Sequence, residues 1–322
     1  MRLHIHSAGI VILFFSLSIF AEVAEPIPSL LARGRVDEAI STLRSRISVS
    51  PNDAEAHNLL CRAYFSLGDW NRGVEDCEKA TSLEPSNSRY HMWLGRIYGE
   101  KADRANFMTA AGLAKKVRTE FEAAVQLNPK SVDARTDLAE FYLEAPGIVG
   151  GGRDKAEAQA SALSTLDPAK AHWVNARIAE KKKKSAAAEQ EYRAAIKSSQ
   201  GAASAWLNLA LYYKHTNKLN EMTDAIGNVS SAHLDRADAL VDAAEILIHT
   251  DRNLPQAAQL LKRYISSTTT VEQAPPFKAH YLLGTVLQKQ GDKQAAEREF
   301  RSALALAKNF SPAQQALDRI NQ

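Results

Sequence analysis

The apolar residues of this chain fall into pairs of stripes at helical spacing. Within residues 54–67, for example, Leu60, Tyr64 and Leu67 are separated by four and three positions, which places them on one side of a helix. A glycine then interrupts the helix and a second stripe follows, until Pro85 ends it because proline cannot continue a helix. The pattern predicts two paired helices joined by a tight turn.

The same order of residues returns about every 34 positions along the chain, and a period of this length indicates stacked helix pairs. Leu94, Gly95 and Tyr98 repeat the first-helix positions, and Leu283 and Gly284 repeat them again near the C-terminal end. The sequence therefore predicts an all-α solenoid, an array of helix-turn-helix motifs over residues 54–310. The expected motifs begin near Ala54, Ser88, Val132, Ala169, Ala203, Asp235 and Phe277.

Shorter elements flank this array. Residues 22–53 hold half a motif, in which Pro26 and Pro28 leave room for only a short first helix. Residues 311–322 contain one further amphipathic helix. Repeat arrays need terminal units with a polar outer face, so we expect an N-terminal and a C-terminal cap at the two ends of an elongated, curved rod.

Two insertions interrupt the period, both between the two helices of a motif. They lie within residues 101–116 and 145–153. Turns of the same type project from the same edge of a solenoid, so we expect two neighbouring inserted turns that form a composite surface. We interpret the glycines at 150–152 as a turn before a helix with Asp154 as its N-cap. An anion site on free backbone amides and a contact with a partner are the alternatives.

The motifs resemble those of the tetratricopeptide repeat (TPR) family. That family combines a Leu-Gly pair and an aromatic residue in the first helix with alanine, an aromatic residue, alanine and proline in and after the second. The resemblance covers nearly the whole chain after residue 21 and implies a right-handed α-solenoid, whose first helices line a concave groove for extended peptides or partner helices. By alignment, it implies a partner groove formed by Asn58, Arg62, Phe65, Met92, Arg96, Thr136, Glu140, Leu207, Leu211, Lys214, Tyr281, Thr285 and Gln288. The lysine and asparagine set with which some members hold a terminal carboxylate is absent.

The first 21 residues differ from the rest. Arg2 precedes an apolar run from Ala8 to Ala21, and the polar Glu22 follows. As a helix this run is about 21 Å long, shorter than the ~30 Å hydrocarbon layer of a membrane. We interpret residues 1–21 as a cleaved signal peptide, with an uncleaved anchor as the alternative. We therefore expect an exported protein, periplasmic or secreted, without stable membrane insertion after cleavage.

Composition and charge exclude some classes of protein. Apolar residues make up 45% and charged residues 24% of the chain, as in ordered globular proteins. The net charge of +3 gives no concentrated basic face, so no nucleic-acid partner is expected. We interpret Lys181 to Lys184 as a solvated turn, with contact to an acidic partner as the alternative.

Among the side chains that could carry chemistry, the two cysteines allow two interpretations. Cys61 and Cys77, the only cysteines, lie on the two helices of one motif. In an exported protein they could form a disulfide, and two buried thiols used in packing are the alternative.

Four histidines occupy equivalent places in four motifs, namely His57, His91, His172 and His280. Such places are about 10 Å apart, whereas zinc binds its ligands at about 2 Å. We therefore predict that these histidines contribute to packing. No catalytic, metal-binding or cofactor-binding arrangement stands out, and an enzyme is not expected.

The leading functional hypothesis is an exported, non-catalytic scaffold that binds a partner protein or peptide through the concave groove and the inserted edge loops. A module that binds a small molecule or a glycan at the glycine-rich edge is the first alternative. An accessory subunit of an envelope enzyme complex is the second.

Overall fold

A computed structural model of the protein describes residues 25–320. These residues form seventeen α-helices and one 3-10 helix, with no β-strand among them, which confirms the predicted all-α class. The expected signal peptide, residues 1–21, lies outside the described residues.

Seven helix pairs form the array, preceded by one shorter pair and followed by one single helix. The seven pairs are α3 (Ala54–Leu67) with α4 (Trp70–Leu83), α5 (Ser88–Ala102) with α6 (Phe107–Leu127), α7 (Val132–Glu144) with α8 (Arg153–Leu166), α9 (Pro168–Lys181) with α10 (Ser185–Ser198), α11 (Ala203–His215) with α12 (Leu219–Ser231), α13 (Ala239–His249) with α14 (Leu254–Ile265), and α15 (Pro276–Lys289) with α16 (Lys293–Leu306). The flanking elements are α1 (Ile27–Ala32), α2 (Val36–Val49) and α17 (Ser311–Ile320), and the 3-10 helix η1 (Gly147–Val149) lies between α7 and α8.

Local signals set the ends of many helices. In the first full pair, the Asp53 side chain accepts a hydrogen bond from the backbone N–H of Ala56 and caps α3. Gly68 ends α3 in the left-handed conformation, and Asp69 caps α4 by accepting from the N–H of Arg72. This arrangement explains why a glycine and an aspartate suffice for a tight turn between antiparallel helices.

One helix begins later than its motif predicts. The sixth motif was expected to start near Asp235, but α13 begins at Ala239. Asp235 instead accepts hydrogen bonds from both the backbone N–H and the hydroxyl of Ser204. Because this carboxylate caps the start of α11, the chain around it is held in a loop.

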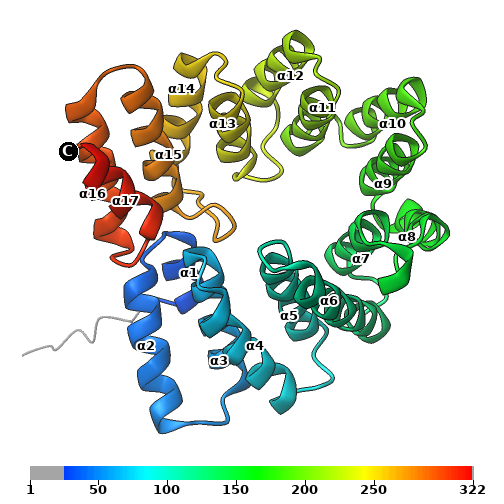
Figure 1. Ribbon diagram of the computed structural model, residues 1–322, viewed down its shortest axis with the longest axis horizontal. Coiled ribbons are helices and arrows are strands. Elements are labelled where there is room, and N and C mark those ends of the chain that lie inside the picture. The colour runs from blue at the N-terminus through cyan, green and yellow to red at the C-terminus, as the bar shows by residue number, and fades with distance from the viewer. Residues whose placement is uncertain (1–24, 321–322) are drawn as a thin grey trace, which may run out of the picture.

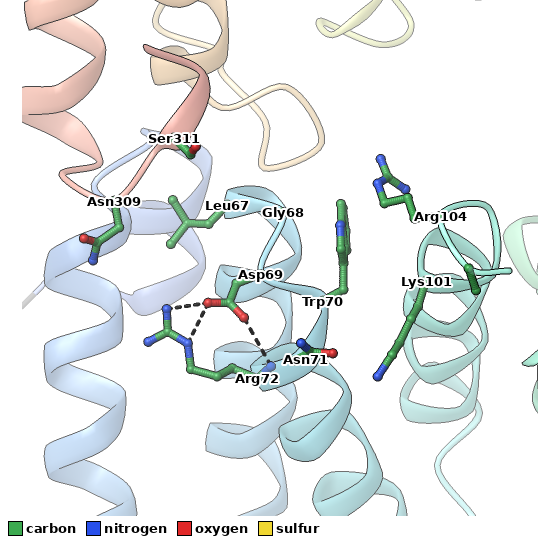
Figure 2. A pocket seen from close by; sticks show the side chains of 11 residues that line it. Leu67, Gly68, Asp69, Trp70, Asn71, Arg72, Lys101, Arg104, Asn309 and Ser311 are labelled. Atoms are coloured by element: carbon green, nitrogen blue, oxygen red, sulfur yellow. Dashed lines mark hydrogen bonds and ion pairs between the residues drawn. The ribbon is translucent and has the colours of Figure 1, made fainter. Parts of the chain in front are cut away.

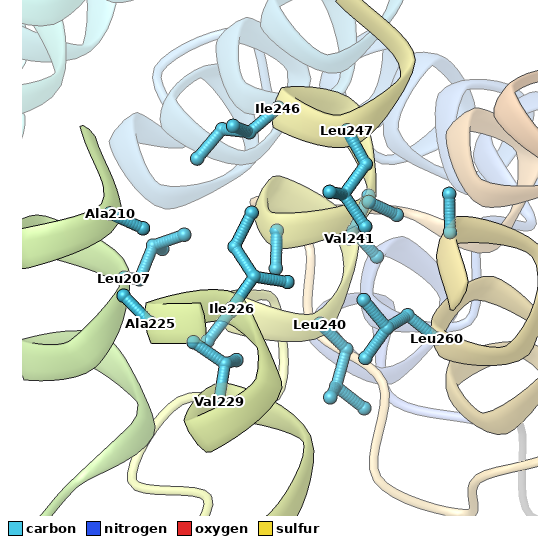
Figure 3. Packing of buried hydrophobic residues seen from close by; sticks show 14 of the residues in the cluster. Leu207, Ala210, Ala225, Ile226, Val229, Leu240, Val241, Ile246, Leu247 and Leu260 are labelled. Atoms are coloured by element: carbon cyan, nitrogen blue, oxygen red, sulfur yellow. The ribbon is translucent and has the colours of Figure 1, made fainter. Parts of the chain in front are cut away.

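The largest hydrophobic cluster lies in the second half of the array, where α11 to α14 meet (Figure 3). Ile226 and Val229 on α12 lie among Leu207 from α11 and Leu240 and Val241 from α13. All are at most 3% exposed. The core is thus distributed along the array, as expected when each pair covers the apolar face of its neighbour.

The array closes on itself (Figure 1). The helix pairs follow one another around a ring, and α1 and α2 at one end lie beside α15 to α17 at the other. The expected elongated rod is therefore wrong. The first helices α9, α11 and α13 lie on the inner side of the ring, and the second helices of the same pairs lie outside.

We call the junction of the two ends the seam, and it has its own hydrophobic core. Leu30 and Leu31 from α1 belong to one cluster with Phe277 from α15 and with Phe310, which precedes α17. The rings of Phe277 and Phe310 are 4.9 Å apart, centroid to centroid. The two end elements that were expected to cap a rod therefore bury apolar surface against one another.

Polar contacts also cross the seam. The backbone N–H of Lys308 donates a 2.9 Å hydrogen bond to the carboxylate of Asp37 on α2. On the inner side, the loop between α14 and α15 reaches α3, where Glu272 forms a bidentate ion pair with Arg62. Both side chains of this pair are only 12% exposed.

Candidate partner-binding surfaces

The predicted groove residues lie on the first helices of the pairs, but few of them are freely exposed. Asn58, Met92 and Leu207 are buried, and Glu140 is the one residue of the thirteen that is exposed. The others are half-buried. The side-chain polar atoms of Asn58 have no hydrogen-bond partner among the described residues.

The two arginines of the predicted groove are held by contacts within the chain. Arg62 pairs with Glu272 across the seam, and the Nε of Arg96 donates to Asp137 of the next motif at 2.6 Å. Both guanidinium groups also lie over the ring of Trp93, at 5.2 and 5.1 Å from its centroid. The basic end of the groove is thus neutralised by the protein's own carboxylates.

Ion pairs between neighbouring motifs continue along the inner face. Glu144 pairs with Arg177 at 2.6 Å and with Lys181 at 2.7 Å, and Lys278 pairs with Glu245 at 2.9 Å. These pairs join successive first helices. On this face most charged side chains have a structural partner, which lowers the charge available to a ligand.

Burial affects the protonation of acidic groups on this face. Burial raises the pKa of Asp137, and Arg96 acts in the opposite direction. Burial also raises the pKa of Asp242 on α13 to about 6, with the neighbouring Asp238 adding to the effect.

The first insertion differs from the turn that was expected over residues 101–116. Only residues 103–106 lie between helices, and the rest extends α6 at its N-terminal end to a length of 21 residues. Asn106 caps this helix by accepting from the N–H of Thr109. The extension carries Phe107 and Met108, which are 84% and 83% exposed.

The second insertion folds into η1 and contacts α6 at Arg118, beyond the residues of the first insertion. Val149 is buried, and its carbonyl oxygen lies 3.5 Å from the Nη1 of Arg118 on α6. Ile148 beside it points away from the core and is 88% exposed. The two insertions thus expose three large apolar side chains.

The glycine cluster of this insertion serves the turn itself. The N–H groups of Gly150, Gly151 and Gly152 donate to the carbonyls of Gly147, Pro146 and Tyr142. These three amides are therefore not free to bind an anion. The expected N-cap is also wrong: Gly152 occupies that place in α8, and Asp154 lies inside the first turn.

Cys61 and Cys77 form a disulfide that joins α3 to α4, with their Cα atoms 5.2 Å apart. Both residues are fully buried. The sequence left open whether the two cysteines form a disulfide or remain buried thiols, and the structure contains the disulfide. It lies in the pair that also contributes to the seam.

The four equivalent histidines each hydrogen-bond a carboxylate on the second helix of the same pair. The Nδ1 to carboxylate distances are 2.7, 2.6, 2.7 and 2.6 Å for His57–Asp76, His91–Glu120, His172–Glu191 and His280–Glu299. We call these contacts the histidine clasps. Sequence reasoning missed the carboxylates, although they follow the histidines by 19 residues, or 29 in the motif with the longer helix.

One clasp gives a prediction about pH. Hydrogen bonding to Glu120 raises the pKa of His91, against the effect of burial. A histidine with a raised pKa stabilises the fold fully below its ordinary pKa of about 6.5. This stabilisation is lost as the pH rises through the raised value. We expect His91→Gln to lower the unfolding free energy by roughly 1.5–3 kcal/mol at low pH.

Thermal unfolding from about pH 5.5 to pH 9 measures this effect. The difference in stability between the wild type and His91→Gln should shrink as the pH rises. His215→Gln, a change at an exposed histidine, is the control and should show no such trend. A pH-independent loss for His91→Gln would rule out a charged clasp.

No cluster of three or more possible metal ligands occurs within residues 25–320. In the same part of the chain, no helix has both the length and the apolar character that crossing a bilayer requires.

The repeated helix pairs and the inner face of first helices define a helical repeat protein. Residues 30–98 and 277–310 match models of the tetratricopeptide repeat family. The chain therefore contains tetratricopeptide repeats in these two stretches. No curated protein matches the sequence significantly.

Solved structures show the same fold. The yeast Tom70 structure aligns over 95% of this chain and 66% of its own, with 14% identity and a TM-score of 0.53. A thermophilic TPR protein from Thermus thermophilus aligns over 57% of this chain and 93% of its own, with 21% identity and a TM-score of 0.47. At these identities the likeness concerns the fold.

Proposed function

We propose that this protein is an exported, non-catalytic scaffold that binds a partner protein at the edge formed by its two insertions. Tetratricopeptide repeats are protein-interaction scaffolds in general. The observation that carries the proposal is the exposure of Phe107, Met108 and Ile148, each above 80%. Large apolar side chains that are exposed in this way mark a candidate interaction site.

The inner face is the second contact surface in this proposal. Leu211 and Tyr281 are half-buried there and retain some accessible surface. Most charges on that face are paired within the chain, so we assign it to apolar and shape complementarity with an extended segment of the partner. Charge pairing with Arg62 and Arg96 of the predicted groove has a smaller role.

Two observations support export. Residues 1–21 have the pattern of a signal peptide, and the Cys61–Cys77 disulfide suits an oxidising compartment.

We expect Phe107→Glu combined with Ile148→Glu to reduce partner recovery at least tenfold. Burying one large apolar side chain contributes about 1.5–3 kcal/mol, and 1.4 kcal/mol corresponds to a factor of about ten in affinity. The measurement is quantitative affinity purification of the tagged full chain from envelope and culture-fluid fractions. Sequencing the N-terminus of the same material tests cleavage before Glu22.

Val49→Glu is the matched control, because Val49 is also 84% exposed but lies at the end of α2. Its substitution should leave recovery unchanged. Equal recovery with the edge variant and the wild type would exclude the edge as the docking site.

A further inference from the structure

The seam carries a groove that is lined by residues from both ends of the array. It consists of two adjoining pockets of about 450 and 370 Å³, which share Leu67, Arg72 and Asn309. We call them together the seam groove. Figure 2 shows the larger pocket, with Asn309 and Ser311 from the C-terminal end on one side and Lys101 and Arg104 from the second helix pair on the other.

The seam groove is basic. Its walls contain five basic residues against two acidic ones. Both acidic residues are engaged within the chain: Asp37 accepts from the backbone of Lys308, and Asp69 pairs with Arg72 and caps α4. The basic residues are Arg44, Arg72, Lys101, Arg104 and Lys308.

Two of these cations, Lys101 and Lys308, are available to a ligand, whereas a third, Arg44, donates a hydrogen bond to the hydroxyl of Tyr64. Within residues 25–320, neither the Lys101 nor the Lys308 ammonium group forms an ion pair. Lys101 belongs to the larger pocket and Lys308 to the smaller one. Lys101 comes from α5 and Lys308 from the loop before α17. They therefore lie on opposite sides of the residues that the two pockets share.

The walls between the cations are suited to a peptide. Trp70 stands in the larger pocket beneath the guanidinium of Arg104, whose carbon is 4.6 Å from the ring centroid. Ile40 and Leu67 add apolar surface in the smaller pocket. The side-chain amide of Asn71 can bond a peptide backbone, and the Ser311 hydroxyl, which accepts from Gln315, can still donate.

We propose that the seam groove binds an extended acidic segment of a protein. Carboxylates of the segment pair with Lys101 and Lys308, and an apolar side chain between them lies against Trp70 and Leu67. Because the groove joins residues 67–72 and 101–105 with residues 308–311, a bound segment crosses the seam and favours the closed ring. The groove borders the first insertion through Lys101, Arg104 and Ala105, but its two lysines differ from the apolar side chains proposed for the insertion edge. Separate variants therefore test the two proposals, and either can fail without the other.

The experiment measures binding of a fluorescent peptide with alternating glutamate and leucine to the full chain at low salt. A peptide with glutamine in place of glutamate reports charge-independent binding. We expect Lys101→Glu combined with Lys308→Glu to weaken binding of the acidic peptide at least tenfold. Neither lysine has a side-chain bond to lose within the described residues, so the fold should be retained, as circular dichroism can show.

Lys183→Glu combined with Lys184→Glu is the control, with the same change in charge. These two residues lie exposed in the turn before α10 and should leave the affinity unchanged. Equal weakening by this control, or equal binding of the glutamine peptide, would overturn the proposal. Binding of an acidic polysaccharide but not of the peptide would also overturn it.

Discussion

Gly34→Val is expected to open the ring. Gly34 lies in the turn between α1 and α2 with a φ of +71°, and a Cβ there would lie 3.0 Å from the Cδ and 3.2 Å from the backbone nitrogen of Pro276. A valine strains the turn by about 1–2 kcal/mol, and the clash with Pro276 across the seam adds about 1–3 kcal/mol of overpacking. Separation of the two ends relieves the clash.

Gly68→Val is the matched control. Gly68 occupies the equivalent turn between α3 and α4 with a φ of +73°, and its nearest neighbour to a new Cβ is Trp70 at 3.5 Å. This variant carries the same backbone strain without a contact across the seam. Small-angle X-ray scattering should show a larger radius of gyration for Gly34→Val alone. Equal radii for both variants would show that the seam tolerates the added side chain.

Loss of the disulfide between α3 and α4 is expected to destabilise the protein by about 3 kcal/mol, because Cys61 and Cys77 close a loop with a sequence separation of 16 and constrain the unfolded chain. For a chain of this size, that corresponds to a decrease of roughly 5 °C in Tm. Calorimetry of Cys61→Ala combined with Cys77→Ala measures it.

Reduction provides the control for this variant. Wild-type protein refolded in reductant should show a similar decrease in Tm, whereas the double alanine variant should be insensitive to reductant. If reductant left the wild type unchanged, the bond would contribute nothing to stability.

The helix pairs could be predicted from the sequence because their determinants are local. Leu60, Tyr64 and Leu67 define a stripe within one helix, and Gly68 and Asp69 define the turn that follows. The start of α13 could not be predicted in this way. It depends on a contact between Asp235 and Ser204, 31 residues earlier.

Closure of the ring could not be predicted either. The curvature of a solenoid follows from a small rotation at each interface, and a slight error in each rotation accumulates over the array. The residues that meet at the seam, such as Asp37 and Lys308, are 271 positions apart. Neither carries a pattern that indicates the other.

The candidate surfaces were predicted in part. The alignment located Arg62 and Arg96 on first helices, but their ion pairs with Glu272 and Asp137 depend on other motifs and on the seam. The carboxylates of the histidine clasps could have been found from their 19-residue spacing, which recurs in three motifs. That a partner binds the thirteen residues of the predicted groove stays a prediction.

Closure changes how the protein can come apart. An open array loses its outermost units first, because each has only one neighbour, and such fraying makes denaturation gradual. Here the contacts between α1 and Phe277 or Phe310 give the two outermost units a second neighbour. Unravelling from either tip must first break this extra interface, so the closed circle should resist proteases and melt more sharply than a linear array of equal length.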